Sequence, residues 1–258
     1  MNQRYSLFMV SFGLLAGLLS SCATKKDQIL FQGLNESLQS EVSYTSRKIQ
    51  VNDILDVKVS ALNPETAIPY NTINLGGNNV NNVSLLSLQG YLVSVDGAIG
   101  LPILGNISAG GKTMSELEAD IISVLENNGH LVSPKVTIRI LNAKVTILGE
   151  VTNPGTYTYT EQYITLPQAL GYAGDVTIGA NRKEVWLIRE EDGVRKYHKI
   201  DLTQTDWFNS PYYTIKQNDI IYVHPNEVMV KSAGFIGNTS TVLSVISILF
   251  TTYALLIR

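Results

Sequence analysis

The feature that most constrains this chain is a long stretch without charge at its C-terminal end. Residues 232–257 contain no Asp, Glu, Lys or Arg, and Lys231 and Arg258 flank them. The more apolar part, residues 239–257, would extend about 28 Å as a helix at roughly 1.5 Å per residue, close to the thickness of a hydrocarbon core. The sequence therefore predicts a C-terminal transmembrane helix within residues 233–258.

Hydroxyl side chains are frequent in this stretch, since seven of the residues in 239–257 are Ser or Thr. At about 100° per residue, four of them fall within an arc of roughly 60° and form a predicted pore-lining face: Ser240, Ser244, Ser247 and Thr251. The predicted lipid-facing set lies opposite: Val242, Ile246, Leu249, Tyr253 and Leu256. Two interpretations stay open, because the hydroxyls either face water or bond to the carbonyl four residues earlier and let helices pack closely.

The chain has a single cysteine, Cys22, at the end of a short apolar run that follows Arg4. A basic start, an apolar run and small residues are the layout of a secretory signal. The segment Leu19–Cys22, "LSSC", resembles the lipobox of bacterial lipoproteins. We therefore expect residues 1–21 to be a signal peptide and Cys22 to be lipidated. An ordinary signal peptide or an N-terminal membrane helix is the alternative.

Composition and motifs argue against several functional classes. The formal net charge of −3, without a large basic cluster, disfavours a nucleic-acid partner. The sequence has no P-loop, Gly-x-Ser-x-Gly, HExxH or dinucleotide fingerprint, so it predicts no catalytic residues, no cofactor and no metal. His130, His198 and His224 are dispersed, and ordinary surface roles are expected for them. Tyr157, Tyr159 and Tyr163 are expected to pack in a sheet, with stacking on sugar as the alternative.

The central part of the chain alternates strand and helix signals. Apolar and polar residues alternate over 49–62, and two short strands are expected around Asp96-Gly97. Thr113 with Glu116 forms a capping box that opens a helix, and a second capping box begins at Thr165. The Asn-rich segment 71–84 is expected to be a solvated loop, with a ligand-binding loop as the alternative.

Two further patterns concern turns. The pair Pro154-Gly155 suits the centre of a type II turn between two strand-forming runs. The tripeptide Asn-Asp-Ile occurs at 52–54 and again at 218–220, and each copy precedes a run with strand character. We interpret the second pattern as a weak internal echo of one turn that leads into a strand.

Two motif runs in order resemble the bacterial outer-membrane polysaccharide export lipoproteins. The first, Gly97–Gly105 "GAIGLPILG", resembles the polysaccharide export domain, and the second, Gly149–Tyr157 "GEVTNPGTY", resembles the soluble-ligand-binding β-grasp domain. The motif residues are Gly97, Pro102, Gly105, Gly149, Glu150, Pro154 and Gly155. Asn52 stands where the family usually has glycine, and Asp175 stands where it often has glycine.

The resemblance implies an α+β chain with a single β-grasp-like domain. The expected domains are a signal peptide (1–21), a lipidated tether (22–42), a polysaccharide export domain (43–141), a β-grasp domain (142–232) and the C-terminal helix (233–258). Copies of that helix would form an oligomeric α-helical barrel. A ring of eight helices spaced roughly 10 Å apart would leave a lumen of about 8 Å radius.

The functional expectations follow from the same resemblance. It implies an outer-membrane channel for capsular polysaccharide or exopolysaccharide, with most of the chain in the periplasm and the C-terminus at the cell surface. The implied partners are other copies in a ring, with an octamer favoured, outer-membrane lipid, and an inner-membrane polysaccharide copolymerase, often linked to a tyrosine autokinase. The alternative is a lipid-anchored periplasmic adaptor or polysaccharide-binding scaffold of an envelope transport complex.

Overall fold

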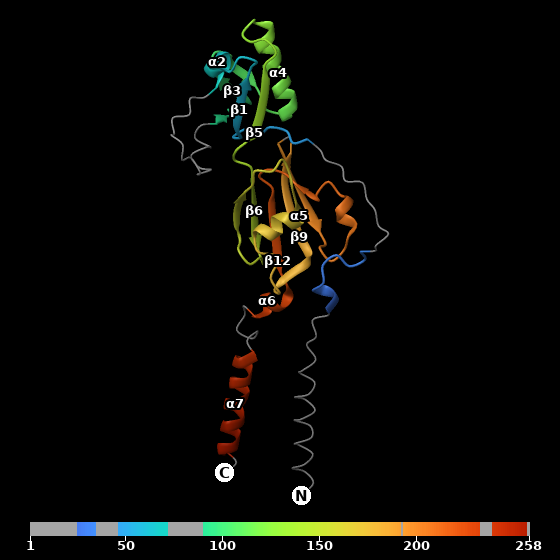
Figure 1. Cartoon of the computed structure of the whole chain (residues 1–258). Coiled ribbons are helices and arrows are strands. Elements are labelled where there is room, and N and C mark those ends of the chain that lie inside the picture. The colour runs from blue at the N-terminus through green and yellow to red at the C-terminus, as the bar shows by residue number, and fades with distance from the viewer. Residues whose placement is uncertain (1–24, 35–45, 72–89, 192, 233–238, 257–258) are drawn as a thin grey trace.

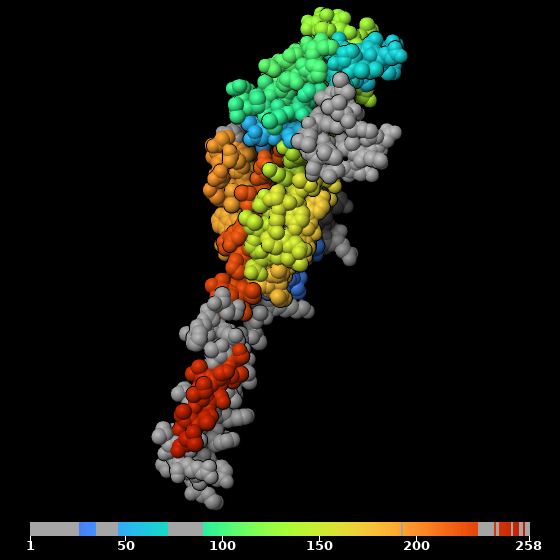
Figure 2. All heavy atoms as spheres, turned by 90° about the vertical axis from the view of Figure 1, so that its left-hand side faces the viewer, coloured from blue at the N-terminus to red at the C-terminus, as the bar shows by residue number. Residues whose placement is uncertain are grey.

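The computed structural model describes residues 25–34, 46–71, 90–191, 193–232 and 239–256. The described parts follow one another along a long axis (Figure 1). A first domain (46–71 and 90–141) lies at one end, a second domain (142–232) lies in the middle, and helix α7 (Thr239–Leu256) lies at the other end. Figure 2 shows the same order from a second direction.

The first domain is a small antiparallel sheet covered by one long helix. The sheet order is β2-β1-β5, with β1 in the centre. A separate hairpin, β3–β4, packs beside it. The elements are β1 (Ile54–Ser60), α2 (Pro64–Ala67), η2 (Ile68–Tyr70), β2 (Tyr91–Leu92), β3 (Ala98–Leu101), β4 (Gly105–Ser108), α4 (Met114–Asn127) and β5 (Lys135–Ile140).

Helix α4 begins where the capping box at Thr113 predicted a helix. The Thr113 side chain accepts the Glu116 backbone N–H, while the Glu116 carboxylate accepts the Thr113 N–H, so both halves of the capping box are present. Buried side chains recur at helical spacing, with Leu117, Ile121 and Leu125 all fully buried. This apolar face packs against β5, and the two elements enclose the core of the domain.

The two short strands expected around Asp96-Gly97 are present as β2 and β3. They do not pair with each other, because β2 pairs with β1 whereas β3 pairs with β4. The tight hairpin instead turns after Leu101, where Ile103 and Gly105 both have positive φ. Gly97 also has a positive φ of 74°, and its carbonyl accepts the N–H groups of Ala109 and Gly110.

The second domain is a five-stranded mixed sheet in the order β10-β9-β12-β6-β7. Strands β6 and β12, near the two ends of the domain's sequence, are parallel neighbours in the middle of the sheet, and the other pairs are antiparallel. This layout fits the expected β-grasp-like module. The elements are β6 (Lys144–Gly149), β7 (Gly155–Thr158), β8 (Ile164–Thr165), α5 (Leu166–Tyr172), β9 (Ala180–Glu191), β10 (Val194–Ile200), η3 (Asp206–Asn209), β11 (Thr214–Ile215), β12 (Ile220–Pro225) and α6 (Glu227–Ser232).

Local sequence signals explain how α5 begins but not the turn before it. Thr165 and Gln168 form the expected capping box, and Leu166 and Leu170 of α5 are buried. The expected type II turn at Pro154-Gly155 is wrong, because Gly155 already belongs to β7 and does not have the positive φ that this turn requires.

A short N-terminal segment packs onto the second domain. It includes η1 (Lys25–Asp27) and continues to Leu34. The Phe31 N–H donates to the Leu202 carbonyl, and the Phe31 ring contacts the rings of Trp207 and Phe208 at centroid distances of 6.0 and 5.4 Å. Part of the segment expected to be a tether is therefore a structural piece of the second domain.

Helix α7 forms where a C-terminal helix was expected. Within the described residues, no helix combines the length and the apolar character needed to cross a membrane. The transmembrane barrel therefore stays a prediction from the sequence.

Candidate functional site

The predicted pore-lining side chains lie on α7, and all four are exposed. The Ser244 hydroxyl donates to the Ser240 carbonyl at 2.8 Å, and the Thr251 hydroxyl donates to the Ser247 carbonyl at 2.7 Å. These are the bonds to the preceding turn that the sequence left open. A hydroxyl oxygen that donates its proton keeps acceptor lone pairs. The hydroxyls of Ser244 and Thr251 are therefore satisfied within their own helix and are still able to accept from water or from a second helix.

Of the five predicted lipid-facing side chains, the structure describes only that of Ile246. Ile246 is half-buried, whereas the side chains of Val242, Leu249, Tyr253 and Leu256 lie outside the described part of the structure. Other large apolar side chains of α7 are exposed, including Leu243, Ile248 and Leu255. Cys22 also lies outside the described residues, as does the Asn-rich segment from residue 72 onward.

The first family motif, with Gly97, Pro102 and Gly105, shapes the loops around β3. A Cβ on Gly97 would lie 3.4 Å from the Gly110 Cα, so the two backbones are in close contact there. Pro102 follows β3 directly, and Gly105 opens β4 with a φ of 72°. In this structure the motif residues form the β3–β4 hairpin and allow the backbones at Gly97 and Gly110 to lie in close contact.

The second family motif fastens the lower end of the second sheet. A Cβ on Gly149 would lie only 2.0 Å from the Val223 carbonyl oxygen of β12, so no larger residue fits. The Glu150 carboxylate accepts the Thr177 hydroxyl at 2.8 Å. The Tyr157 hydroxyl donates to the carbonyl of Asn153, which precedes Pro154 and Gly155. These contacts are structural, and they join the β6–β7 loop to the loop before β9 and to strand β12.

The repeated Asn-Asp-Ile tripeptides form the same turn in both domains. Asn52 and Asn218 have positive φ of 69° and 62°, a region that asparagine tolerates better than most residues. The Gln50 N–H donates to the Asp53 carboxylate at 2.9 Å, and the Lys216 N–H donates to the Asp219 carboxylate at 2.8 Å. Both aspartates are buried. The internal echo seen in the sequence is therefore a shared local structure.

The same backbone requirement explains the two departures from the family pattern. Asn52 has positive φ, and Asp175 has positive φ of 69°. Glycine enters this region without steric cost, and Asn and Asp are the side chains most often found there. At both positions where the resemblance implies glycine, the residue present is one of the few others that adopt this backbone shape.

These two turns bind each other and join the domains. The Gln217 side-chain amide donates to the Asp53 carboxylate, and both groups are buried. The Asn218 amide donates to the Gln50 side-chain oxygen at 3.2 Å. Burial raises the pKa of Asp53 above its usual value, while the hydrogen bonds from Gln50 and Gln217 oppose this rise. The junction was not predicted, because the sequence shows the repeat but not that its copies meet.

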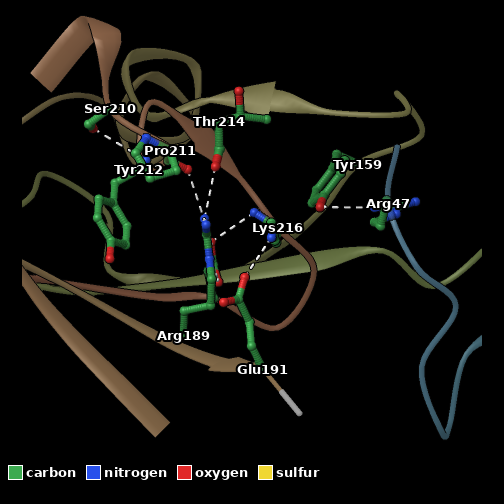
Figure 3. Close-up of polar contacts among 10 residues, drawn as sticks. Arg47, Tyr159, Arg189, Glu191, Ser210, Pro211, Tyr212, Thr214 and Lys216 are labelled. Carbon is green, nitrogen blue, oxygen red and sulfur yellow. Dashed lines mark hydrogen bonds and ion pairs between the residues drawn. The ribbon is translucent and has the colours of Figure 1, made fainter. Parts of the chain in front are cut away.

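A buried ion pair anchors the second turn from below. The Arg189 guanidinium donates to the Asp219 carboxylate at 2.9 and 2.6 Å, and both side chains are almost completely buried. Arg189 also donates to the carbonyls of Pro211 and Thr214, as Figure 3 shows. One arginine therefore holds the turn and a neighbouring loop together.

A polar pocket of about 180 Å³ lies beside the junction. Arg47, Thr113 and Glu118 line it from the first domain, and Gln162 and Tyr163 line it from the second. Arg47 also donates to the Tyr159 hydroxyl at 3.1 Å (Figure 3). Of the three tyrosines expected in the sheet, Tyr159 is buried, Tyr157 is partly buried and Tyr163 is exposed. The lining offers donors, acceptors and one ring.

The histidines show no arrangement for ligation in the described residues. The His198 ring stacks on Tyr212 at 3.6 Å, and burial together with the Arg189 charge lowers the pKa of His198. His130 contacts the Tyr70 ring, and His224 contacts Tyr222. Across the described part of the chain, no three His, Cys, Asp or Glu side chains gather in a way that could hold a metal ion.

Comparison with known proteins gives two curated relatives with related names. The EPS I polysaccharide export outer membrane protein EpsA of Ralstonia solanacearum is 28% identical over 208 residues, which cover 77% of this chain and 53% of the relative. The EpsA protein of Ralstonia nicotianae is 32% identical over 146 residues, covering 54% of this chain and 38% of the relative. The chain therefore spans about half or less of the length of these relatives.

Family models match both domains in the order that the motifs indicated. Residues 41–141 match the model described as polysaccharide biosynthesis/export protein, and residues 144–197 match the SLBB domain. The first match contains the Gly97–Gly105 motif and the second contains the Gly149–Tyr157 motif. With both domains present in this order and two polysaccharide export proteins among its relatives, the chain belongs to the polysaccharide export protein family.

Proposed function

We propose that the chain is an outer-membrane lipoprotein that exports a capsular polysaccharide or exopolysaccharide from the periplasm to the cell surface. The observation that carries this proposal is the consecutive match of residues 41–141 and 144–197 to the export and SLBB models. Both relatives are named as outer-membrane polysaccharide export proteins. No catalytic role is assigned to any residue.

The finer proposal is a channel made by a ring of copies, with an octamer favoured. In such a ring the α7 helices form the membrane barrel, with the hydroxyl stripe toward a wet lumen and the C-terminus at the cell surface. The exposure of Ser240, Ser244, Ser247 and Thr251 supports this arrangement. An inner-membrane polysaccharide copolymerase, often linked to a tyrosine autokinase, is the proposed partner at the periplasmic end.

Cysteine labelling tests the lumen. Cysteines placed at Ser244 or Thr251 in the assembled, lipidated protein should react with a small water-soluble thiol reagent, whereas cysteines at Val242 or Leu249 should be protected by lipid. A bulky charged adduct on the hydroxyl face should block export. Equal labelling of both faces would refute the lumen assignment.

Lipidation at Cys22 is tested separately. The variant Cys22→Ser should escape cleavage by the lipoprotein signal peptidase and fail to reach the outer membrane. Normal processing and normal placement of this variant, measured by mass spectrometry and membrane fractionation, would contradict the proposed anchor.

A second candidate function is a lipid-anchored periplasmic adaptor or polysaccharide-binding scaffold. One observation favours it. The hydroxyls of Ser244 and Thr251 are already bonded within α7. An adaptor needs neither a ring nor a wet stripe. Absence of labelling on either face of α7, together with monomeric purified protein, would select this function.

A further inference from the structure

The end of the second domain nearest α7 exposes a group of apolar side chains. Ile178, Val228 and Val230 are 77%, 62% and 58% exposed, and Met229 is 42% exposed. We call these four residues the basal surface. Figure 1 places α6, which carries three of them, between the sheet and α7.

The basal surface is continuous, because α6 and the loop before β9 are bonded to each other. The Asn226 side-chain amide donates to the Ile178 carbonyl at 3.2 Å, and the Asn226 N–H donates to the Gly179 carbonyl at 2.7 Å. A Cβ on Gly179 would lie 2.5 Å from the Met229 Cγ, so Met229 rests directly on this loop.

The charges on α6 are paired with each other. Helix α6 carries one acidic and one basic side chain, Glu227 and Lys231, and they pair with each other at 2.9 Å. Single exposed apolar residues are common on soluble proteins. Here, four exposed apolar side chains lie on two adjoining segments, and the two charged side chains of α6 are paired with each other. Such a group is a candidate contact surface.

Both ends of the second domain's chain meet at this place. Helix α6 leads directly into the uncharged residues 232–257. At the other end, Asp27 of η1 pairs with Lys183 at 2.5 Å, and Gln28 accepts from Arg182, whose guanidinium donates to the Thr177 carbonyl next to Ile178. The proposed anchor Cys22 precedes η1 by three residues.

We propose that the basal surface lies in the boundary between headgroups and acyl chains of the periplasmic leaflet of the outer membrane. Lipid is its partner because the two segments that would enter the membrane leave the domain beside it. A surface that is apolar, small and nearly neutral suits shallow burial in this boundary. The inference rests on the proposed outer-membrane location and adds a second contact between protein and lipid, independent of α7 and Cys22.

Depth-dependent fluorescence quenching tests the contact in the full-length protein. The variants Ile178→Cys and Val228→Cys are labelled with a small fluorophore and reconstituted into phosphatidylethanolamine–phosphatidylglycerol vesicles whose acyl chains are brominated just below the headgroups. The matched control is Val132→Cys, because Val132 is 84% exposed in the loop between α4 and β5, at the far end of the molecule. The parent chain, labelled in parallel, reports any signal from Cys22.

We expect quenching at positions 178 and 228 to be several-fold stronger than at position 132. Equal quenching at all three positions would overturn the proposal. A shift of emission at 178 and 228 without quenching by brominated lipid would also overturn it, because a neighbouring copy then covers the surface.

A fourth variant separates this inference from the proposed function. Ile246 belongs to the predicted lipid-facing set of α7, and Ile246→Cys reports whether α7 itself reaches lipid. Quenching at 246 without quenching at 178 and 228 refutes the basal contact and leaves the membrane role of α7 intact. Quenching at 178 and 228 alone supports the basal contact and argues against a membrane-embedded α7.

Discussion

Removing Arg189 should destabilise the second domain strongly. In the variant Arg189→Met, the Asp219 carboxylate stays buried and loses every bond from the guanidinium, keeping the Lys216 N–H as its described hydrogen-bond donor. The carbonyls of Pro211 and Thr214 lose their bonds to the same group. Breaking one partner of a buried ion pair costs about 3–5 kcal/mol, because an uncompensated charge remains inside the protein.

The adjoining hairpin strand offers a matched control. Arg195 pairs with Glu190 at 3.3 Å, but these side chains are 61% and 62% exposed. Exposed pairs contribute little to stability because water screens them, so Arg195→Ala should be close to the parent protein in stability. Both variants remove an ion-paired arginine, one buried and one exposed.

Tryptophan fluorescence during denaturant unfolding measures both variants. The chain has two tryptophans, Trp186 and Trp207, and both belong to the second domain. The midpoint shift multiplied by the denaturant slope gives the change in the free energy of unfolding. If Arg189→Met loses no more stability than Arg195→Ala, the assignment of a strong buried pair is wrong.

A double variant separates charge from packing. Adding Asp219→Asn to Arg189→Met removes the buried charge while an amide oxygen can still accept the Lys216 N–H. We expect the double variant to recover part of the lost free energy of unfolding. A double variant as unstable as Arg189→Met would show that the loss arises from packing instead of uncompensated charge.

Three further features can be tested by substitution. Lys216 and Lys196 lower the pKa of Glu191 to about 2. Its contribution to the free energy of unfolding is therefore complete above its ordinary pKa and is lost as the pH falls toward 2. The variant Glu191→Gln should lose less stability over this acid range than the parent protein. Gly149→Ala should cost more than about 2 kcal/mol, because a strained φ and a backbone clash add together, whereas Gly193→Ala, with open space around it, should cost about 1–2 kcal/mol in the same unfolding assay. Gln217→Ala should cost about 1–3 kcal/mol by leaving Asp53 short of a donor, and amide hydrogen exchange should quicken around the first turn; unchanged exchange would exclude a role in joining the domains.

Local sequence patterns predicted the parts of the fold that depend on neighbouring residues. The capping boxes at Thr113 and Thr165 involve residues three apart, and both are present. The buried face of α4 follows from the spacing of its leucines and isoleucine. Such features can be predicted from the sequence because both partners of each contact lie within about one helical turn.

Contacts between residues that are far apart in the sequence could not be predicted in this way. Phe31 was expected to belong to a polar tether, yet its ring partners Trp207 and Phe208 lie far away in the sequence, in the second domain. The bond between Gln217 and Asp53 likewise joins residues separated by 164 positions. The candidate site on α7 was predicted as a stripe, but a pattern of hydroxyls cannot distinguish a bond to the same helix from a contact with water, because either partner suits the same side chain.

The parallel pairing of β6 and β12 has a mechanical consequence. Strand β6 begins where the chain arrives from the first domain, and β12 ends where it departs toward α6. Tension between the first domain and the C-terminal helix therefore pulls these neighbouring strands lengthwise in opposite directions. The ladder from Thr146↔Ile220 to Gly149↔Val223 is then loaded in shear, so its hydrogen bonds share the force and must yield together instead of opening one after another. Tension applied between the first domain and α7 would therefore meet its strongest resistance at the centre of the second sheet.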